Sequence, residues 1–153
     1  MPDWRQPARG HLGFSAKTTY GLLALMELAD IASSGERLQV GEIAARQAIP
    51  ERYLEQMMTS LRRGGILRSI RGARGGYQLA KRAEQIQLSE VMACLEGDPS
   101  PSDPSSGSTE LQVISALADE LRRQRYARLE ATTLADLQRQ RDTLRQAQAM
   151  YFI

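Results

Sequence analysis

The sequence predicts a mostly α-helical fold that carries one small two-stranded β-hairpin and ends in a long helix. Three observations support this class. Apolar residues recur at intervals of three and four in several segments, two short alternating stretches flank a glycine-rich loop at 71–76, and a second region of helical periodicity follows residue 109. At 153 residues and 42% apolar, the chain is long enough for one domain with a real core.

The chain begins with a tail and a helix. Residues 1–13 hold two prolines, two glycines and scattered charge, so we expect a flexible N-terminal tail. Ser15 is suited to cap the helix that follows, over residues 15–33. Apolar side chains cover much of its circumference, which favours a helix packed inside a bundle. A turn is expected at 33–36, with Gly35 in the left-handed conformation.

Two short helices follow with a brief link. The first spans residues 40–49, and Pro50 enforces a break before the second at 51–63. This arrangement predicts a helix-turn-helix, whose second helix presents its N-terminal half to a DNA groove. Its inner face carries Leu54, Met57, Met58 and Leu61. The opposite face holds side chains that can contact bases or phosphates, or can simply be solvated: Arg52, Glu55, Gln56, Thr59, Arg62 and Arg63.

A hairpin with a basic tip is expected next. Residues 66–70 and 77–79 alternate as strands, and the glycine-rich loop between them carries Arg71 and Arg74. Residues 62–82 contain seven Lys or Arg and no Asp or Glu. We therefore expect these cations to lack local acidic partners and to create a positive field that attracts phosphate. A nucleotide-binding loop is the alternative, but its GKS or GKT ending is missing.

The C-terminal part predicts an association surface. After a short helix at 88–95, residues 97–109 form a flexible Pro/Ser loop. Apolar residues at helical spacing then form a stripe that needs another apolar surface to pack against. We favour a second copy of the chain, in a symmetric homodimer, over docking of the stripe on the first helix. The predicted dimerisation residues are Leu111, Ile114, Leu117, Ala118 and Leu121. Thr133 and Asp136 resemble a capping box that opens a final, mostly polar helix to residue 150, which we expect to fray.

Composition excludes several classes. No apolar run approaches the roughly 20 residues that span a bilayer, and residues 1–13 are too polar for a signal peptide. A single cysteine, Cys94, excludes an intrachain disulfide and suits a reducing compartment. We therefore expect a soluble cytoplasmic protein without membrane contact. Enzyme chemistry is disfavoured, because His11 lies in the tail and Cys94 has no neighbouring histidine in the sequence.

Four segments together resemble the Rrf2 family of bacterial winged-helix transcription regulators. They are FSAKTTYGLLALMELA, IPERYLEQMMTSLRRGGIL, RSIRGARGGYQLAK and IQLSEVMACLEG, and they lie between residues 14 and 97. The resemblance implies a winged helix-turn-helix DNA-binding domain at 14–96 with a two-stranded wing. Residues 110–153 would form a long dimerisation helix and a C-terminal helix.

By this resemblance the protein is a homodimer on a palindromic site in double-stranded DNA, usually as a repressor. The second helix of the helix-turn-helix would face the major groove, and Arg71 and Arg74 would reach phosphate or the minor groove. The predicted DNA-binding residues are Lys17, Arg52, Tyr53, Glu55, Gln56, Thr59, Arg62, Arg63, Arg71, Gly72, Arg74 and Gly75.

The chain departs from the family pattern at its cofactor residues. Cluster-binding members carry three cysteines in the region that corresponds to 94–108, and an extra ligand near the start of the first helix. Here Cys94 stands alone, and Thr18 and Thr19 occupy the first-helix area. One thiolate cannot hold a two-iron cluster in the usual four-ligand manner, so neither cofactor nor metal is predicted. Cys94 is expected to be a buried small residue.

A second functional class stays open on the sequence alone. The winged helix could serve as a protein-interaction module that controls, or is controlled by, a regulatory protein partner. The acidic C-terminal part of the chain would then be the contact surface, because residues 96–153 hold 7 Lys or Arg against 9 Asp or Glu.

Overall fold

The structure is a computed structural model that describes residues 13–97, 103 and 106–151. Most of the predicted tail, including His11, and most of the predicted Pro/Ser loop lie outside the described residues. No helix in the described ranges is long and apolar enough to cross a bilayer.

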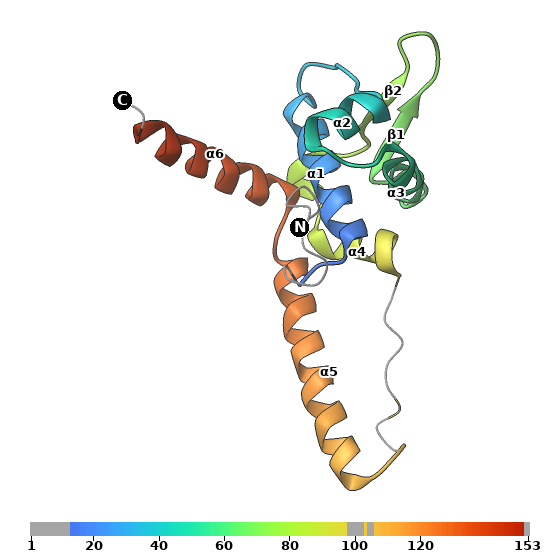
Figure 1. Ribbon diagram of the computed structural model, residues 1–153, viewed down its shortest axis with the longest axis vertical. Coiled ribbons are helices and arrows are strands. Elements are labelled where there is room, and N and C mark those ends of the chain that lie inside the picture. The colour runs from blue at the N-terminus through green and yellow to red at the C-terminus, as the bar shows by residue number, and fades with distance from the viewer. Residues whose placement is uncertain (1–12, 98–102, 104–105, 152–153) are drawn as a thin grey trace, which may run out of the picture.

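The predicted mostly helical class with one small hairpin is confirmed. A body of four helices and the hairpin lies together, and two further helices project from it in different directions (Figure 1). In chain order the elements are α1 (Ala16–Asp30), α2 (Val40–Gln47), α3 (Glu51–Arg63), β1 (Leu67–Ile70), β2 (Gly76–Leu79), the 3-10 helix η1 (Ala83–Gln85), α4 (Leu88–Glu96), α5 (Thr109–Glu130) and α6 (Leu134–Met150).

The core is centred on the contact between α1 and α3 and extends to the hairpin and α4. Leu25 and Leu28 of α1 and Leu54, Met58 and Leu61 of α3 have no exposed surface. The inner face predicted for the second helix of the helix-turn-helix is therefore confirmed. Its burial holds α3 against the body and turns the opposite face outward.

Local signals fix several helix ends as predicted, although the first helix ends at Asp30 and not at residue 33. The Ser15 hydroxyl accepts a hydrogen bond from the Thr18 amide at 3.2 Å, and Gly35 has φ +73°. The helix predicted to reach residue 49 ends at Gln47 instead, because Ala48 adopts φ +53°. The Ile49 amide then donates back to the Ala44 carbonyl at 2.9 Å, which closes the turn of the helix-turn-helix.

The hairpin is joined to the loop between α1 and α2. Strands β1 and β2 pair antiparallel, with Leu67 opposite Leu79. Leu38 forms an isolated bridge to Tyr77, with the Tyr77 amide donating to the Leu38 carbonyl at 2.8 Å. Gly76 is required here, since a Cβ on it would lie 2.7 Å from the Leu38 carbonyl oxygen. The second strand of the hairpin is thus joined, near its loop end, to the segment that leads into α2.

The turn between α5 and α6 belongs to the same core. Leu134 is fully buried, and Ala135 joins the same apolar cluster. The Leu134 amide donates to the Ile86 carbonyl, and the Leu88 amide to the Thr132 carbonyl, both at 2.9 Å. The core therefore crosses the boundary between the predicted 14–96 domain and the C-terminal helices.

Helix α6 begins with the predicted capping box, in which the Asp136 amide donates to the Thr133 hydroxyl at 3.1 Å. Fraying was expected along this helix, but it stays helical to Met150. One reason is a contact that the sequence does not reveal. Arg141 pairs with Asp30 of α1 at 2.8 Å and ties the middle of α6 to the body.

Candidate nucleic-acid interface

The outer face of α3 is open to solvent along its length. Arg52, Tyr53, Glu55 and Gln56 of its first turns are exposed, and Tyr53 retains 53% of its accessible surface. Thr59 is half-buried, and its hydroxyl donates to the Glu55 carbonyl at 2.9 Å. The Thr59 hydroxyl therefore donates its proton within the helix, and the hydroxyl oxygen remains available as a hydrogen-bond acceptor.

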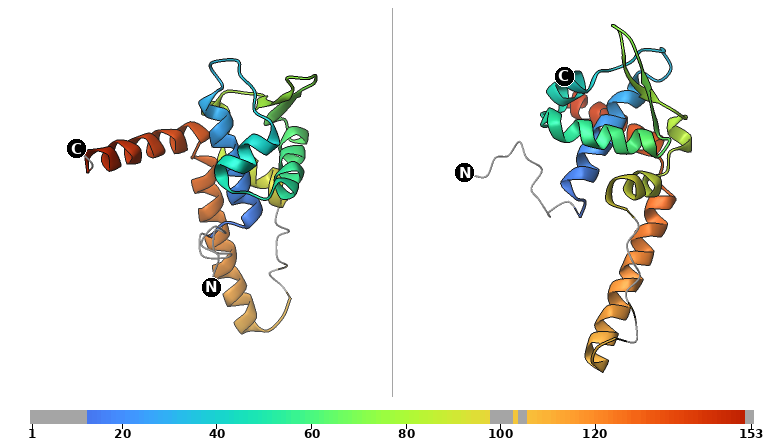
Figure 2. Two further views of the ribbon diagram at one scale, coloured as in Figure 1. Left: turned by 45° about the horizontal axis from the view of Figure 1, so that its top comes forward. Right: turned by 90° about the vertical axis from the view of Figure 1, so that its right-hand side faces the viewer.

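Unpaired cations continue from α3 into the hairpin. Within the described ranges, no acidic side chain lies within ion-pair distance of the exposed arginines Arg52, Arg62, Arg63, Arg71 and Arg74. The hairpin follows α3 directly and projects beside it (Figure 2). These elements share one positive surface, which suits the phosphates of a nucleic acid.

The run of unpaired cations predicted over residues 62–82 extends too far at its C-terminal end. Lys81 pairs with Glu90, and Arg82 with Glu84 at 3.5 Å, because η1 and α4 turn acidic residues back toward the strand. Arg68 is also engaged, since it donates to the Gln78 side chain at 2.8 Å. The expectation that these charges lack local partners is therefore wrong for Lys81 and Arg82.

The loop between the strands presents its two arginines on a backbone that needs glycine. Gly72 has φ +114°, which side chains other than glycine rarely adopt. A Cβ on Gly75 would lie 2.5 Å from the Ile70 carbonyl oxygen. Both predicted glycines therefore shape the loop that exposes Arg71 and Arg74.

Two further exposed cations lie on segments that contact α3 or the hairpin. Lys17 is exposed in the first turn of α1, which packs against α3. Arg37, which was not predicted, is exposed immediately before Leu38, the residue that bridges to Tyr77 of β2. No sequence signal indicated Arg37, because its position depends on the long-range bridge between Leu38 and Tyr77.

The described residues do not suit an iron-sulfur cluster. No group of three His, Cys, Asp or Glu side chains within the described ranges is placed to hold a metal ion, and the whole sequence has one cysteine and one histidine. Cys94 is half-buried rather than fully buried, and its sulfur occupies the space where a Cβ on Gly64 would lie. Burial raises the pKa of this thiol, as does the nearby Glu90, against the opposing effect of Lys81. A protonated thiol is a poor metal ligand.

The predicted dimerisation stripe is exposed on α5. Leu111, Ile114, Leu117 and Leu121 retain 49%, 63%, 62% and 58% of their accessible surface, and Ala118 is exposed as well. The alternative that this stripe docks on the first helix is wrong, because the helix that packs on α1 from this part of the chain is α6. In Figure 1 the exposed part of α5 extends away from the body.

A helix-turn-helix, a two-stranded wing and unpaired arginines on both define a winged-helix DNA-binding transcription regulator. Comparison with known proteins agrees. The Rrf2 family, described as "Iron-dependent Transcriptional regulator", matches residues 14–140, and the chain belongs to this family. Its members are transcription regulators and not enzymes.

Individual relatives cover most of the chain. The transcriptional regulator IscR of Cereibacter sphaeroides is 36% identical over 131 residues, which is 80% of this chain and 84% of that protein. CymR of Bacillus subtilis is 33% identical over 143 residues, 90% of this chain and 97% of that protein.

Solved structures show the same fold. IscR of T. potens superimposes with a TM-score of 0.69 at 31% identity, covering 86% of this chain and 90% of that one. CymR of B. subtilis, described as a global cysteine regulator, gives 0.65 at 32% identity and covers 82% and 95%.

Proposed function

We propose that the chain is a homodimeric, sequence-specific repressor that binds a palindromic promoter site through α3 and the wing. The observation that carries this proposal is the exposed apolar stripe of α5. Large apolar side chains gathered on one face of a projecting helix are costly in water and are typical of an interaction surface.

A second copy of the same helix is the simplest cover for this stripe. In a two-fold dimer the stripes of the two copies pack against each other, so a single contact buries both stripes. The dimer would carry two α3 helices into successive major grooves, roughly 34 Å apart along the DNA. The exposed side chains of α3 would contact base edges, and Arg71 and Arg74 would contact the backbone.

The direct test is fluorescence anisotropy on the DNA upstream of the protein's own gene, with unrelated DNA of equal length as the control. We expect a palindromic segment to bind at least about a thousandfold more tightly than the unrelated DNA at physiological salt. Equal binding to both, lost as salt approaches physiological concentration, would contradict sequence-specific recognition.

We propose in addition that the protein works without an iron-sulfur cluster, because the ligand set described above is incomplete. Anaerobic purification with iron analysis and an absorption spectrum tests this. The expected result is less than one iron per dimer and no visible absorption. A brown protein with about two iron atoms per subunit would overturn it.

The remaining expectations concern the cellular location of the protein and its protein partners. A repressor acts where the bacterial chromosome lies, so we place the protein in the cytoplasm. A regulatory protein partner stays a prediction, and co-purification from a cell extract, with and without DNA digestion, would test it.

A further inference from the structure

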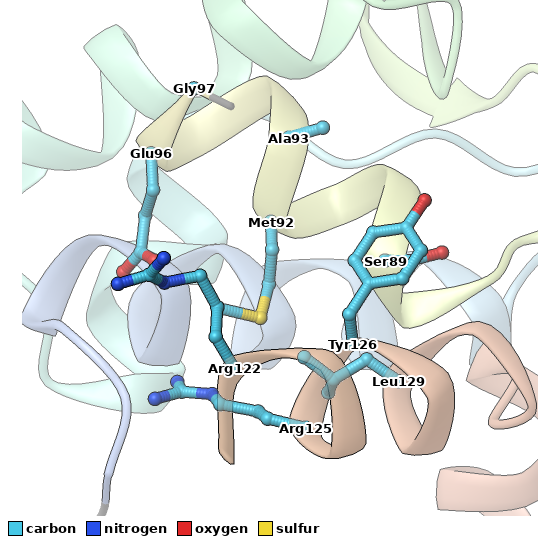
Figure 3. A pocket seen from close by; sticks show the side chains of 9 residues that line it. All are labelled: Ser89, Met92, Ala93, Glu96, Gly97, Arg122, Arg125, Tyr126 and Leu129. Atoms are coloured by element: carbon cyan, nitrogen blue, oxygen red, sulfur yellow. The ribbon is translucent and has the colours of Figure 1, made fainter. Parts of the chain in front are cut away.

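A groove of about 300 Å³ lies between α4 and α5, outside the candidate DNA-binding surface. Its apolar part is formed by Met92 and Ala93 of α4 and by Tyr126 and Leu129 of α5 (Figure 3). The volume is at the lower end of the range for sites that bind small molecules, and a mostly apolar lining is typical of them.

Charged side chains of both signs gather at one end of the groove. In Figure 3 the charged ends of Glu96, Arg122 and Arg125 all lie toward one side of the groove. Partial burial acts to raise the pKa of Glu96, but hydrogen bonds from Ser15 and Thr18 and the charge of Arg125 outweigh it and lower the pKa. Glu96 is therefore ionised at neutral pH.

Both arginines are held in place and keep donors for a ligand. Arg122 donates one Nη hydrogen bond to Asp119 at 2.7 Å. Arg125 donates to the Gly13 carbonyl, and its guanidinium lies 5.3 Å from the centre of the Phe14 ring. A guanidinium has five N–H donors, so neither contact exhausts it.

We propose that this groove binds a free α-amino acid with an apolar side chain. The ligand carboxylate would pair with Arg122, its ammonium group with Glu96, and its side chain would lie along Met92 and Leu129. Guanidinium and carboxylate groups match in geometry, which favours this end for a carboxylate.

The mixed charge favours a ligand that carries both charges. A carboxylic acid without an amino group would pair with Arg122 but leave Glu96 without a ligand partner, and an amine without a carboxylate would be repelled by Arg122 and Arg125. An amino acid carries both charges at one end of an apolar body and matches the groove in charge and polarity. Binding here does not depend on DNA recognition, so the test uses the full chain without DNA.

The experiment follows the methyl group of Met92 by NMR in full-length protein labelled with ¹³C-methyl methionine. The resonance is assigned with Met92→Leu, and the probes are L-leucine and L-phenylalanine. We expect a saturable shift of the Met92 signal, with little change at Met57 and Met58, which are buried on the inner face of α3. Glycine, 4-methylpentanoate and 3-methylbutylamine should bind at least about tenfold more weakly than leucine, since each lacks one of the matched groups.

Matched variants locate the binding. Arg122→Gln should weaken leucine binding by about tenfold. Arg123→Gln is the control, because Arg123 is the next residue on α5, pairs with Glu120 and does not line the groove. Thermal unfolding of each variant verifies that the fold is intact.

Three outcomes would overturn the proposal. One is the absence of a saturable Met92 shift up to about 10 mM ligand, as when a second copy covers the groove. Another is equal binding of leucine and 4-methylpentanoate, which would indicate a simple carboxylate site. The third is an equal effect of Arg122→Gln and Arg123→Gln.

Discussion

At the scale of the residue, Glu55 stands out as an exposed carboxylate on a face rich in arginine. A carboxylate can accept a hydrogen bond from the amino group of cytosine and is repelled by phosphate, so it selects bases without adding general affinity. Glu55→Ala should therefore change the preferred base at one position of each half-site. Binding to a set of single-base operator variants measures this.

Arg71→Ala is the contrasting substitution at the tip of the wing. It should weaken binding to every sequence and reduce the slope of log affinity against log salt by about 1, as expected for a lost phosphate contact. If both variants lost equal affinity on all sequences, the division between a base-selecting α3 and a phosphate-contacting wing would be wrong.

Gly64 and Cys94 pack closely against each other. Gly64 has φ −78°, which alanine also adopts, but an alanine Cβ would lie 2.1 Å from the Cys94 sulfur. Gly64→Ala should destabilise the protein by about 1–3 kcal/mol through overpacking, measured by urea unfolding. The double variant Gly64→Ala, Cys94→Ala should recover most of this loss. Equal stability of the Gly64→Ala protein with and without the thiol would contradict the contact.

Residue types alone predicted which side chains are basic, but not which of them stay unpaired. Lys81 and Arg82 looked like Arg71 and Arg74 because the run without acidic residues was counted only to residue 82. Arg82 pairs with Glu84, two residues further on, whereas Lys81 reaches Glu90 only through the path of the chain into α4. Local sequence could not resolve this, because the pairing of Lys81 depends on a turn and on the helix that follows it.

At the scale of the element, Glu96 links the end of α4 to the start of α1. Since its pKa is lowered in the folded protein, its contribution to stability is present above its ordinary value of 4.5 and is lost as pH falls through the folded value. Glu96→Gln should therefore be less stable than the unsubstituted protein at pH 7, and the difference should vanish in acid. The effect should be modest, because Glu96 is largely exposed.

Urea unfolding at pH 7 and at about pH 3 measures this difference. Glu36→Gln, at an exposed carboxylate of the loop between α1 and α2, is the control and should leave stability nearly unchanged at both values. A Glu96→Gln defect of the same size in acid would mean that the charge is not its cause.

Helix periodicity predicted the elements well where one face is buried. Leu54, Met57, Met58 and Leu61 located α3 and its inner face correctly. The end of α2 was missed because Ala48 gives no sign of a left-handed conformation. The anchoring of α6 was also missed, since Asp30 and Arg141 are far apart in the sequence.

At the scale of the whole molecule, the proposed dimer rests on the exposed stripe of α5. Leu117→Glu places a charge in the centre of that stripe and should produce a monomer in size-exclusion chromatography with light scattering. Affinity for a palindromic site should fall by about a hundredfold or more, because the two half-sites are no longer linked. Binding to an isolated half-site should be unchanged.

Ala116→Glu supplies the matched control for this prediction. It introduces the same charge at a neighbouring exposed residue of α5, on the opposite side of the helix from the stripe. This variant should remain a dimer with full affinity. A dimeric Leu117→Glu protein would exclude the stripe as the interface.

The groove between α4 and α5 could not be predicted from the sequence, for the same reason as the contact between α6 and α1. Met92 and Glu96 are separated from Arg122 and Tyr126 by a loop and most of α5, so no local pattern unites them. Sequence periodicity can identify a helix and its buried face, but the neighbour that completes a groove is set by the tertiary fold.

The buried turn around Leu134 has a mechanical consequence. With 22 residues, α5 is about 33 Å long, and the body holds it only near its C-terminal end. A helix fixed in this way is a lever, so a rotation of about 5° at the turn would move its far end by roughly 3 Å. In a dimer joined along these levers, a small change in the packing of α4 on α5 would alter the distance between the two α3 helices. The spacing of the half-sites that fit would change with it.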